Sequence, residues 1–248
     1  MNDIHILPTS ERKQLAELLA LGSAADAMVA YYALDHSGDR VTLYTHGPEN
    51  SLPRAFLVMA RTGLDLFRPL VVPFVGQAES LEALLQAALK PEMPVLLDLP
   101  IGQKSWAQEI VDLEGVKDAE LLRLDVSIFV PQINVLVVES ITPDGWPRFE
   151  IRSGEVLQAA AGLNWMGEHF AEVYIEADPV AVTRGFHMAV LSMMANHLLA
   201  DRIIALYRAV DDDSEGRAEA MKMGFRTTGI RLFTAQATLV QESEKTEV

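Results

Sequence analysis

Cysteine is missing altogether from this chain of 248 residues. Its absence excludes disulfide bonds, thiolate nucleophiles and metal sites with cysteine ligands. Long apolar runs are missing too: charged residues or prolines interrupt every run before the roughly 18 residues that a membrane-spanning helix needs. The first residues, MNDIHILPTSERKQ, lack the basic region and apolar run of a signal peptide. We therefore expect a soluble, cytoplasmic protein with no membrane partner.

Positive charge is scarce. Lysine and arginine number 20 against 35 aspartates and glutamates, so the formal net charge is −15. This balance argues against a nucleic-acid partner, because binding to nucleic acid depends on neutralising phosphates with basic side chains. An anionic cofactor would need a local basic or amide-lined pocket, whereas a cationic amine would be attracted. The acidity is also compatible with a role in solubility alone.

Sequence patterns for metal, nucleotide and hydrolase sites are missing as well. The six histidines include no pair spaced four apart, and they have no cysteine partners, so we expect no metal site. The chain also lacks a P-loop, a dinucleotide fingerprint and the residue order of a Ser-His-Asp triad.

Half of the residues are hydrophobic, so the chain can bury a large core in one or two domains. Apolar periodicity and turn residues predict an α/β unit of mixed order in the first half. The predicted strands are 41–45, 55–60, 61–74, 95–99 and 120–129, and the predicted helices are 10–21, 24–34, 80–89 and 105–113.

The second half has a sharper pattern. The predicted strands are 134–139, 148–152, 156–165, 171–177 and 203–210, with a final strand pair over 226–241, and the predicted helices are 182–200 and 214–223. Residues 241–248, QESEKTEV, form a charged tail. From residue 148 onward the predicted order is β-β-β-α-β-α-β-β.

That order and the residues in it resemble the GNAT superfamily of acyl-CoA-dependent N-acyltransferases. The resemblance covers roughly residues 146–239 without a gap. It is carried by AEVYIEADP (171–179), TRGFHMAVL (183–191), IIALYRAV (203–210), DDDS (211–214) and MGFRTTG (223–229). The register of these segments carries the resemblance, because each of them alone is weak.

The resemblance implies an α/β fold with a mixed, twisted sheet flanked by helices. The first half is also similar to a GNAT unit, although it lacks a recognisable phosphate loop. We therefore expect two GNAT-like halves, a degenerate domain over 1–130 and an acyl-CoA domain over 131–248. The alternative is that residues 1–130 form a cap of unrelated topology.

In this family, acyl-CoA lies between two central parallel strands, here 171–177 and 203–210. Its pyrophosphate is held by backbone amides of a loop with the pattern Arg/Gln-x-x-Gly-x-Gly/Ala at a helix N-terminus. The pattern falls on residues 182–187. Gly185 matches it, whereas Val182 and His187 depart from it. The resemblance thus implies that the co-substrate acetyl-CoA contacts Ile175, Ala177, Arg184, Gly185, Phe186, His187 and Asp213.

Catalytic roles are implied for two residues. Glu172 is the candidate general base, since family members carry a carboxylate on this strand; alternatively it is an exposed carboxylate or a partner of Arg148 or Arg152. The family's acid for the leaving thiolate is a tyrosine in the second helix, and Ala220 occupies that position here. Tyr207 on the neighbouring strand is the phenol that can replace it, or else a core residue.

The resemblance therefore implies an N-acyltransferase, in the first place an acetyltransferase, that acts on a small-molecule amine. A homodimer is compatible with these features. The alternative is a non-catalytic descendant that binds a ligand or serves as a scaffold, which the departures at Val182, His187 and Ala220 favour. Asp213, finally, is either the N-cap of helix 214–223 or part of a substrate-ammonium site.

Overall fold

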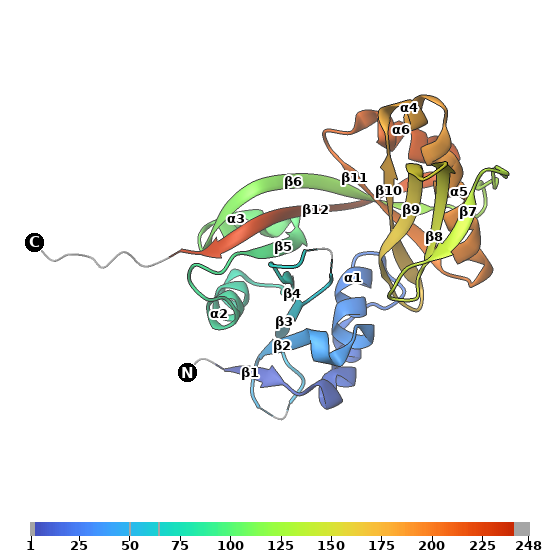
Figure 1. Ribbon diagram of the computed structural model, residues 1–248. Helices are drawn as coiled ribbons and strands as arrows, with labels where there is room; N and C mark the ends of the chain where they lie inside the picture. Colours follow the sequence, from blue (N-terminus) through green and yellow to red (C-terminus); the bar gives the residue numbers. More distant parts are fainter. Residues whose placement is uncertain (1–2, 50, 64, 241–248) are drawn as a thin grey trace, which may run out of the picture. The chain divides into compact units, whose positions relative to one another are not determined.

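The computed structural model describes residues 3–49, 51–63 and 65–240 and forms two compact units (Figure 1). The amino-terminal unit comprises 3–20, 29–118 and 231–240 of these residues, and the carboxy-terminal unit comprises 21–28 and 119–230. Both units are discontinuous in the sequence, because residues 21–28 belong to the carboxy-terminal unit and residues 231–240 return to the amino-terminal one. The division expected from the sequence, into a domain over 1–130 and a domain over 131–248, stays a prediction.

The amino-terminal unit is built on a mixed sheet. Its strands are β1 (Ile4–Leu7), β2 (Val41–His46), β3 (Ala55–Ala60), β4 (Leu70–Phe74) and β5 (Val95–Pro100), followed in the sheet by residues 231–239 of β12 (Phe225–Leu239) and residues 111–118 of β6 (Val111–Leu124). β4 and β5 run parallel and join at Leu70–Leu96 and Val71–Leu97. β1/β2, β2/β3, β3/β4 and β5/β12 are antiparallel.

Helices cover this sheet and close its core. They are α2 (Ala78–Ala88), α3 (Lys104–Gln108) and the short 3-10 helices Thr9–Leu18, Gly38–Arg40 and Ile101–Gln103. In the sequence, α1 (Ala27–Ala30) and the π-helical turn Tyr31–Asp35 come after the helix Thr9–Leu18. Leu81, Leu84 and Leu85 recur on one face of α2 and are fully buried. They pack with Phe233 and Ala235 of β12. The last strand of the chain therefore completes the amino-terminal core.

The strands of the carboxy-terminal unit are also in mixed orientation. Its sheet order is β12-β6-β11-β10-β9-β8-β7, with residues 225–230 of β12 and 119–124 of β6. The other elements are β7 (Val138–Ile141), β8 (Pro147–Ser153), β9 (Val156–Met166), β10 (Phe170–Ala177), α4 (Pro179–Thr183), α5 (Phe186–Ala200), β11 (Ile204–Val210) and α6 (Ser214–Met223). β10 and β11 are parallel, whereas β7/β8, β8/β9, β9/β10 and β6/β11 are antiparallel.

The long helix α5 covers β8, β9 and β10 (Figure 1). Val190, Leu191 and Met194 of α5 are fully buried in one core cluster with Phe149 and Ile151 of β8. The predicted α/β class with a mixed sheet flanked by helices is confirmed. Within the described ranges, no helix is long and apolar enough to cross a membrane.

Several predicted elements were wrong in detail. The helix predicted over 182–200 is two helices, because Gly185 adopts a left-handed conformation (φ 71°) between α4 and α5. The strand predicted over 134–139 starts at Val138 instead, because the Asn134 side chain accepts the Leu136 N–H (2.9 Å) and forms a turn. The strand pair predicted over 226–241 is the single strand β12.

Two further strand and helix ends differ from the prediction. β6 begins at Val111 and ends at Leu124, so residues 109–113 are not the end of a helix and 125–129 are not strand. Asp125 ends β6, because its side chain accepts hydrogen bonds from the Ser127 amide (3.0 Å) and hydroxyl (2.6 Å) in a tight turn. The predicted tail 241–248 lies outside the described residues.

The return of β12 to the amino-terminal unit predicts the effect of truncating its central aromatic side chain. Phe233 is fully buried in the core that α2 covers. Phe233→Ala should lower the free energy of unfolding by about 3–5 kcal/mol, because it removes buried apolar surface and leaves a cavity. Urea denaturation measures this loss. The matched control is Phe67→Ala, whose side chain is 91% exposed and whose loss should change stability by less than about 0.5 kcal/mol; equal effects of the two changes would contradict the packing.

Candidate functional site

The central parallel strands of the carboxy-terminal unit are joined over only part of their length. β10 and β11 pair from Phe170–Ile204 to Val173–Tyr207, and the register stops there. Beyond it, β10 remains paired to β9 as far as Ala177, and β11 remains paired to β6 as far as Val210. The two strands therefore separate toward their carboxyl ends, while each stays anchored on its other side.

A cleft of about 230 Å³ lies at this opening. Both strands and the helices α4, α5 and α6 contribute to its wall. The lining residues are Ile175, Ala177, Val182, His187, Met188, Leu191, Tyr207, Asp213, Glu215, Gly216, Glu219 and Ala220. One side of the cleft is apolar, whereas the side formed by α6 carries three carboxylates.

The start of α5 offers unpaired backbone donors. The first turn of a helix leaves its N–H groups without intrahelical acceptors, and no side chain caps α5. A Cβ built on Gly185 would meet no atom within 4 Å, so the backbone there is accessible. The guanidinium of Arg184 lies over the Phe186 ring, 6.0 Å from its centroid. Arg184, Gly185 and Phe186 are not among the residues that line the cleft.

His187 faces α6 across the cleft. Its Nε2 lies 2.5 Å from Oε2 of Glu219, and the His187 side chain is only 8% exposed. The ring Nδ1 is buried, and within the described residues it has no hydrogen-bond partner. This pair places a carboxylate close to the position that the phosphate-loop pattern reserves for a small residue.

Tyr207 lines the floor of the cleft and packs edge-on against Phe225, with 6.0 Å between the ring centroids. Burial, followed by the nearby charges of Asp213 and Glu219, raises the pKa of the Tyr207 phenol above its ordinary value. The phenol therefore stays protonated at neutral pH and is available as a proton donor.

Asp213 caps α6. Its Oδ1 accepts the Gly216 N–H at 2.8 Å, which satisfies one donor of the first helical turn. The same residue lines the cleft. The structure thus contains the N-cap that the sequence indicated, and a ligand role for Asp213 stays a prediction.

Glu172 is 4% exposed and is held by three donors. The donors are Asn164 Nδ2 (2.8 Å), Trp165 Nε1 (3.1 Å) and Arg208 Nη2 (3.1 Å). Consecutive residues of a regular strand point to opposite faces, but the β9–β10 register shifts here, from Glu172–Trp165 to Val173–Leu163. This bulge lets both Asn164 and Trp165 reach the same carboxylate.

These contacts decide one of the sequence alternatives. Glu172 makes its ion pair with Arg208 of β11 and not with Arg148 or Arg152 of β8. It is not among the residues that line the cleft. Its role as a general base stays a prediction.

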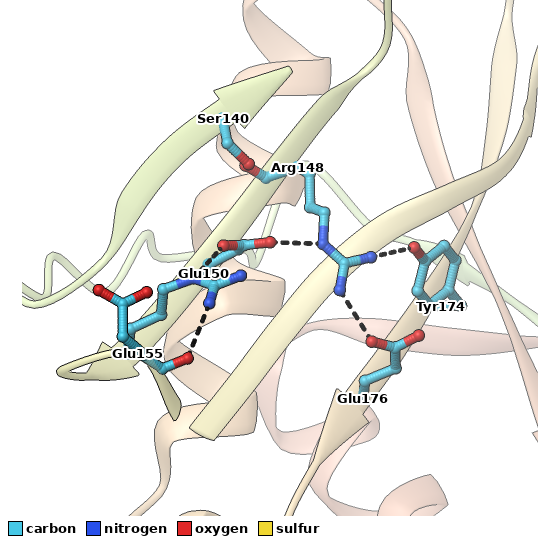
Figure 2. A network of polar contacts seen from close by, with 7 residues as sticks. Ser140, Arg148, Glu150, Glu155, Tyr174 and Glu176 are labelled. Atoms are coloured by element: carbon cyan, nitrogen blue, oxygen red, sulfur yellow. Dashed lines mark hydrogen bonds and ion pairs between the residues drawn. The ribbon is translucent and has the colours of Figure 1, made fainter. Parts of the chain in front are cut away.

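The outer surface of β8 and β10 carries a separate charged network (Figure 2). Arg148 donates to Glu150 (2.7 Å), Tyr174 (2.5 Å) and Glu176 (2.8 Å), and Arg152 donates to the other oxygen of Glu150 (2.8 Å). Burial raises the pKa of Tyr174, so its phenol stays neutral beside Arg148. Each charge in this network is already partnered within the sheet.

The described ranges contain no group of three or more histidine, aspartate or glutamate side chains that could hold a metal ion. The candidate site therefore consists of the cleft, its phenol and the uncapped start of α5.

Solved structures share this architecture over nearly the whole chain. A tandem GNAT protein from the clavulanic acid biosynthesis pathway superimposes with a TM-score of 0.62 at 11% identity, over 98% of this chain and 100% of that one. An acetyltransferase of the GNAT family from Colwellia psychrerythraea superimposes with a TM-score of 0.56 at 8% identity, over 94% of this chain and 98% of that one. This chain has the tandem GNAT fold.

A protein from Drosophila gives a TM-score of 0.68 at 15% identity, over 98% of this chain and 100% of that one. No protein-family model matches the sequence, and no curated protein matches it significantly. Identities this low show a shared fold and leave activity open. The predicted resemblance to GNAT proteins, with two GNAT-like halves, is thus confirmed at the level of the fold.

The GNAT fold brings together only some of the predicted site residues. Ile175, Ala177, His187, Tyr207 and Asp213 meet around one cleft. Sequence reasoning missed Glu219, because its pairing with His187 depends on how α6 packs against α5. It also missed Arg208 as the partner of Glu172, since no local pattern joins residues 36 positions apart.

The charged network in Figure 2 predicts a pH-dependent contribution to stability. Hydrogen bonds from Arg152 and Arg148 hold the pKa of Glu150 below its ordinary value. A lowered carboxyl pKa stabilises the fold above the ordinary value near 4.3 and ceases to do so as the pH falls through the lowered one. Glu150→Gln should therefore lower the free energy of unfolding by about 1 kcal/mol at pH 7 and by less near pH 3. Urea unfolding at both pH values measures the difference; a constant difference would contradict this account.

The three donors around Glu172 predict a larger, structural cost. Glu172→Ala removes a buried carboxylate, leaves the partly buried Arg208 without it, and should destabilise the protein by about 3 kcal/mol in chemical denaturation. The control is Glu176→Ala on the same strand, whose side chain is 54% exposed and whose loss should cost less than about 1 kcal/mol. Similar costs for both variants would show that the Glu172 contacts do not contribute as the geometry indicates.

Proposed function

We propose that this chain is an N-acyltransferase that moves an acetyl or similar acyl group from CoA to a small-molecule amine. The observation that carries the proposal is the opening between β10 and β11, which leaves a cleft lined by both strands. The GNAT fold supports it, since neighbours with the same fold are described as acetyltransferases. Acetyl-CoA is the proposed co-substrate.

The residues around the cleft fit the two chemical parts of CoA differently. Ile175, Val182 and Leu191 supply apolar surface for the chain that carries the thioester. The uncapped N–H groups at the start of α5, the accessible Gly185 backbone and the Arg184 guanidinium would hold the pyrophosphate.

Acetyl-CoA, when bound, supplies a thioester whose carbonyl carbon is attacked by the amine nitrogen, so that a C–N bond forms and the C–S bond breaks. Tyr207, whose raised pKa keeps its phenol protonated at neutral pH, donates that proton to the departing sulfur and regains one from water. We assign the amine proton to water, because Glu172 already accepts hydrogen bonds from three donors.

A second candidate is a non-catalytic protein that binds a ligand in this cleft or acts as a scaffold. One observation favours it: the His187–Glu219 pair places a carboxylate beside the proposed pyrophosphate position. A negative charge there opposes phosphate binding. The two candidates differ in whether acetyl-CoA stabilises the fold.

Thermal unfolding with and without about 1 mM acetyl-CoA separates them. A dissociation constant near 10 µM would add about 2.7 kcal/mol of stability, which raises the melting temperature by about 5 °C or more. Release of free thiol in the presence of a panel of small amines then measures turnover. Absence of both the shift and the thiol release would overturn the acyltransferase proposal in favour of the non-catalytic one.

Two variants make this test specific to the cleft. Val182→Arg with His187→Gly should tighten acetyl-CoA binding, because the double change adds a cation and removes the ring from the loop. Tyr207→Phe should keep the thermal shift and reduce thiol release by about tenfold or more, since the ring remains and only the proton donor is lost. Unchanged turnover in Tyr207→Phe would exclude Tyr207 as the acid.

A further inference from the structure

The amino-terminal unit contains a larger pocket, of about 400 Å³, that takes no part in the proposed reaction. It lies where β2 begins, where β3 ends and where α2 ends. Pro69 before β4 and Val95 of β5 also line it, so it opens at the amino-terminal ends of these parallel strands. α2 begins just after the carboxyl end of β4. The pocket therefore lies at the other end of these strands from the start of α2.

Positive charge gathers at this pocket although the chain as a whole carries a formal charge of −15. Arg40, Arg61 and Lys90 line it, against the single carboxylate of Asp39. That carboxylate accepts a hydrogen bond from the Ser37 hydroxyl. The local charge is therefore opposite in sign to that of the chain.

Backbone geometry holds two of these cations side by side. The Arg61 N–H donates to the Arg40 carbonyl at 2.9 Å, directly beyond the Val41–Ala60 pair of the β2–β3 ladder. The Arg61 carbonyl is fixed in turn by Nε2 of His36 (3.1 Å). Like charges held next to each other repel, and an anion bound between them removes that cost.

Two of the three cations, Arg61 and Lys90, retain binding capacity. Within the described ranges, neither the Arg61 nor the Lys90 side chain makes a hydrogen bond or an ion pair to the protein. Guanidinium groups match the geometry of carboxylate and phosphate oxygens, and an ammonium adds a third set of donors.

The remaining wall of the pocket is apolar. Leu89 and Val95 are 5% and 3% exposed and close the floor, while Phe67 and Met93 at the rim are 91% and 57% exposed. The Asp65 carboxylate holds the turn that carries Phe67, since it accepts the N–H groups of Phe67 and Arg68, both at 2.9 Å. Its bond to the Arg68 side chain and those two amides lower the pKa of Asp65 to about 2, so the turn keeps these bonds at neutral pH.

We infer that this pocket binds a small organic anion whose carboxylate or phosphate contacts Arg40, Arg61 and Lys90, and whose apolar or aromatic body lies against Leu89, Phe67 and Met93. The volume suits a ligand of this size. A free inorganic anion would leave the apolar floor and rim unused, and an uncharged apolar ligand would leave the Arg61 and Lys90 charges without a counter-charge.

The test uses three probes of one shape on the full chain: 2-naphthoate, 2-naphthyl phosphate and the uncharged 2-naphthamide. Fluorescence titration should give saturable binding of at least one charged probe, about tenfold or more tighter than the amide, and weaker at high salt. The tighter of the two charged probes identifies the head group. The inference would be overturned if the amide bound as tightly as both charged probes. It would also be overturned if neither charged probe reached saturation up to about 5 mM.

A matched pair of double variants assigns the binding to these cations. Arg61→Gln with Lys90→Gln should weaken binding of the charged probe by about tenfold or more and leave the affinity for the amide unchanged. Lys13→Gln with Arg54→Gln removes the same charge from exposed positions of the same unit outside the pocket, and should change affinity less than about twofold. Circular dichroism checks that both variants fold, as expected for exposed side chains. Equal weakening by both pairs would reduce the effect to net charge and refute the site.

Discussion

The carboxy-terminal unit depends on one constraint, the incomplete pairing of its central parallel strands. β10 and β11 share backbone hydrogen bonds only from residues 170–173 and 204–207, yet their outer edges remain bonded to β9 and β6. A sheet that is intact on both sides of an opening holds that opening rigidly, because closing it would break the outer ladders. The cleft is therefore a feature of the sheet itself, and the helices α5 and α6 only complete its wall.

Glu172 lies one pair before the end of the β10–β11 pairing and connects β9, β10 and β11. Its donors come from β9 and β11, and the bulge in β9 is what allows two consecutive residues, Asn164 and Trp165, to reach it. A buried carboxylate needs this many partners to offset its desolvation. The same contacts that make Glu172 a link between strands occupy both of its carboxylate oxygens.

Charge is distributed unevenly between the two pockets. The cleft in the carboxy-terminal unit carries Asp213, Glu215 and Glu219, whereas the pocket in the amino-terminal unit carries three cations against one carboxylate. Net charge therefore predicts the partners of the chain poorly at the level of a site. The acidic composition points to amines, whereas the local arrangement of Arg40, Arg61 and Lys90 at the amino-terminal pocket favours anions.

Local patterns in the sequence determined the elements that depend on near neighbours. Strands such as β3 and β10 and the helix α6 with its Asp213 cap follow from patterns within a few residues, so the order of residues alone indicates them. The GNAT fold followed from the register of those elements. Only the tertiary structure decided that Glu172 pairs with Arg208, that His187 meets Glu219, and that β12 completes the amino-terminal core. These contacts join residues 32 or more positions apart, and their geometry depends on bulges and helix packing that no short stretch of sequence encodes.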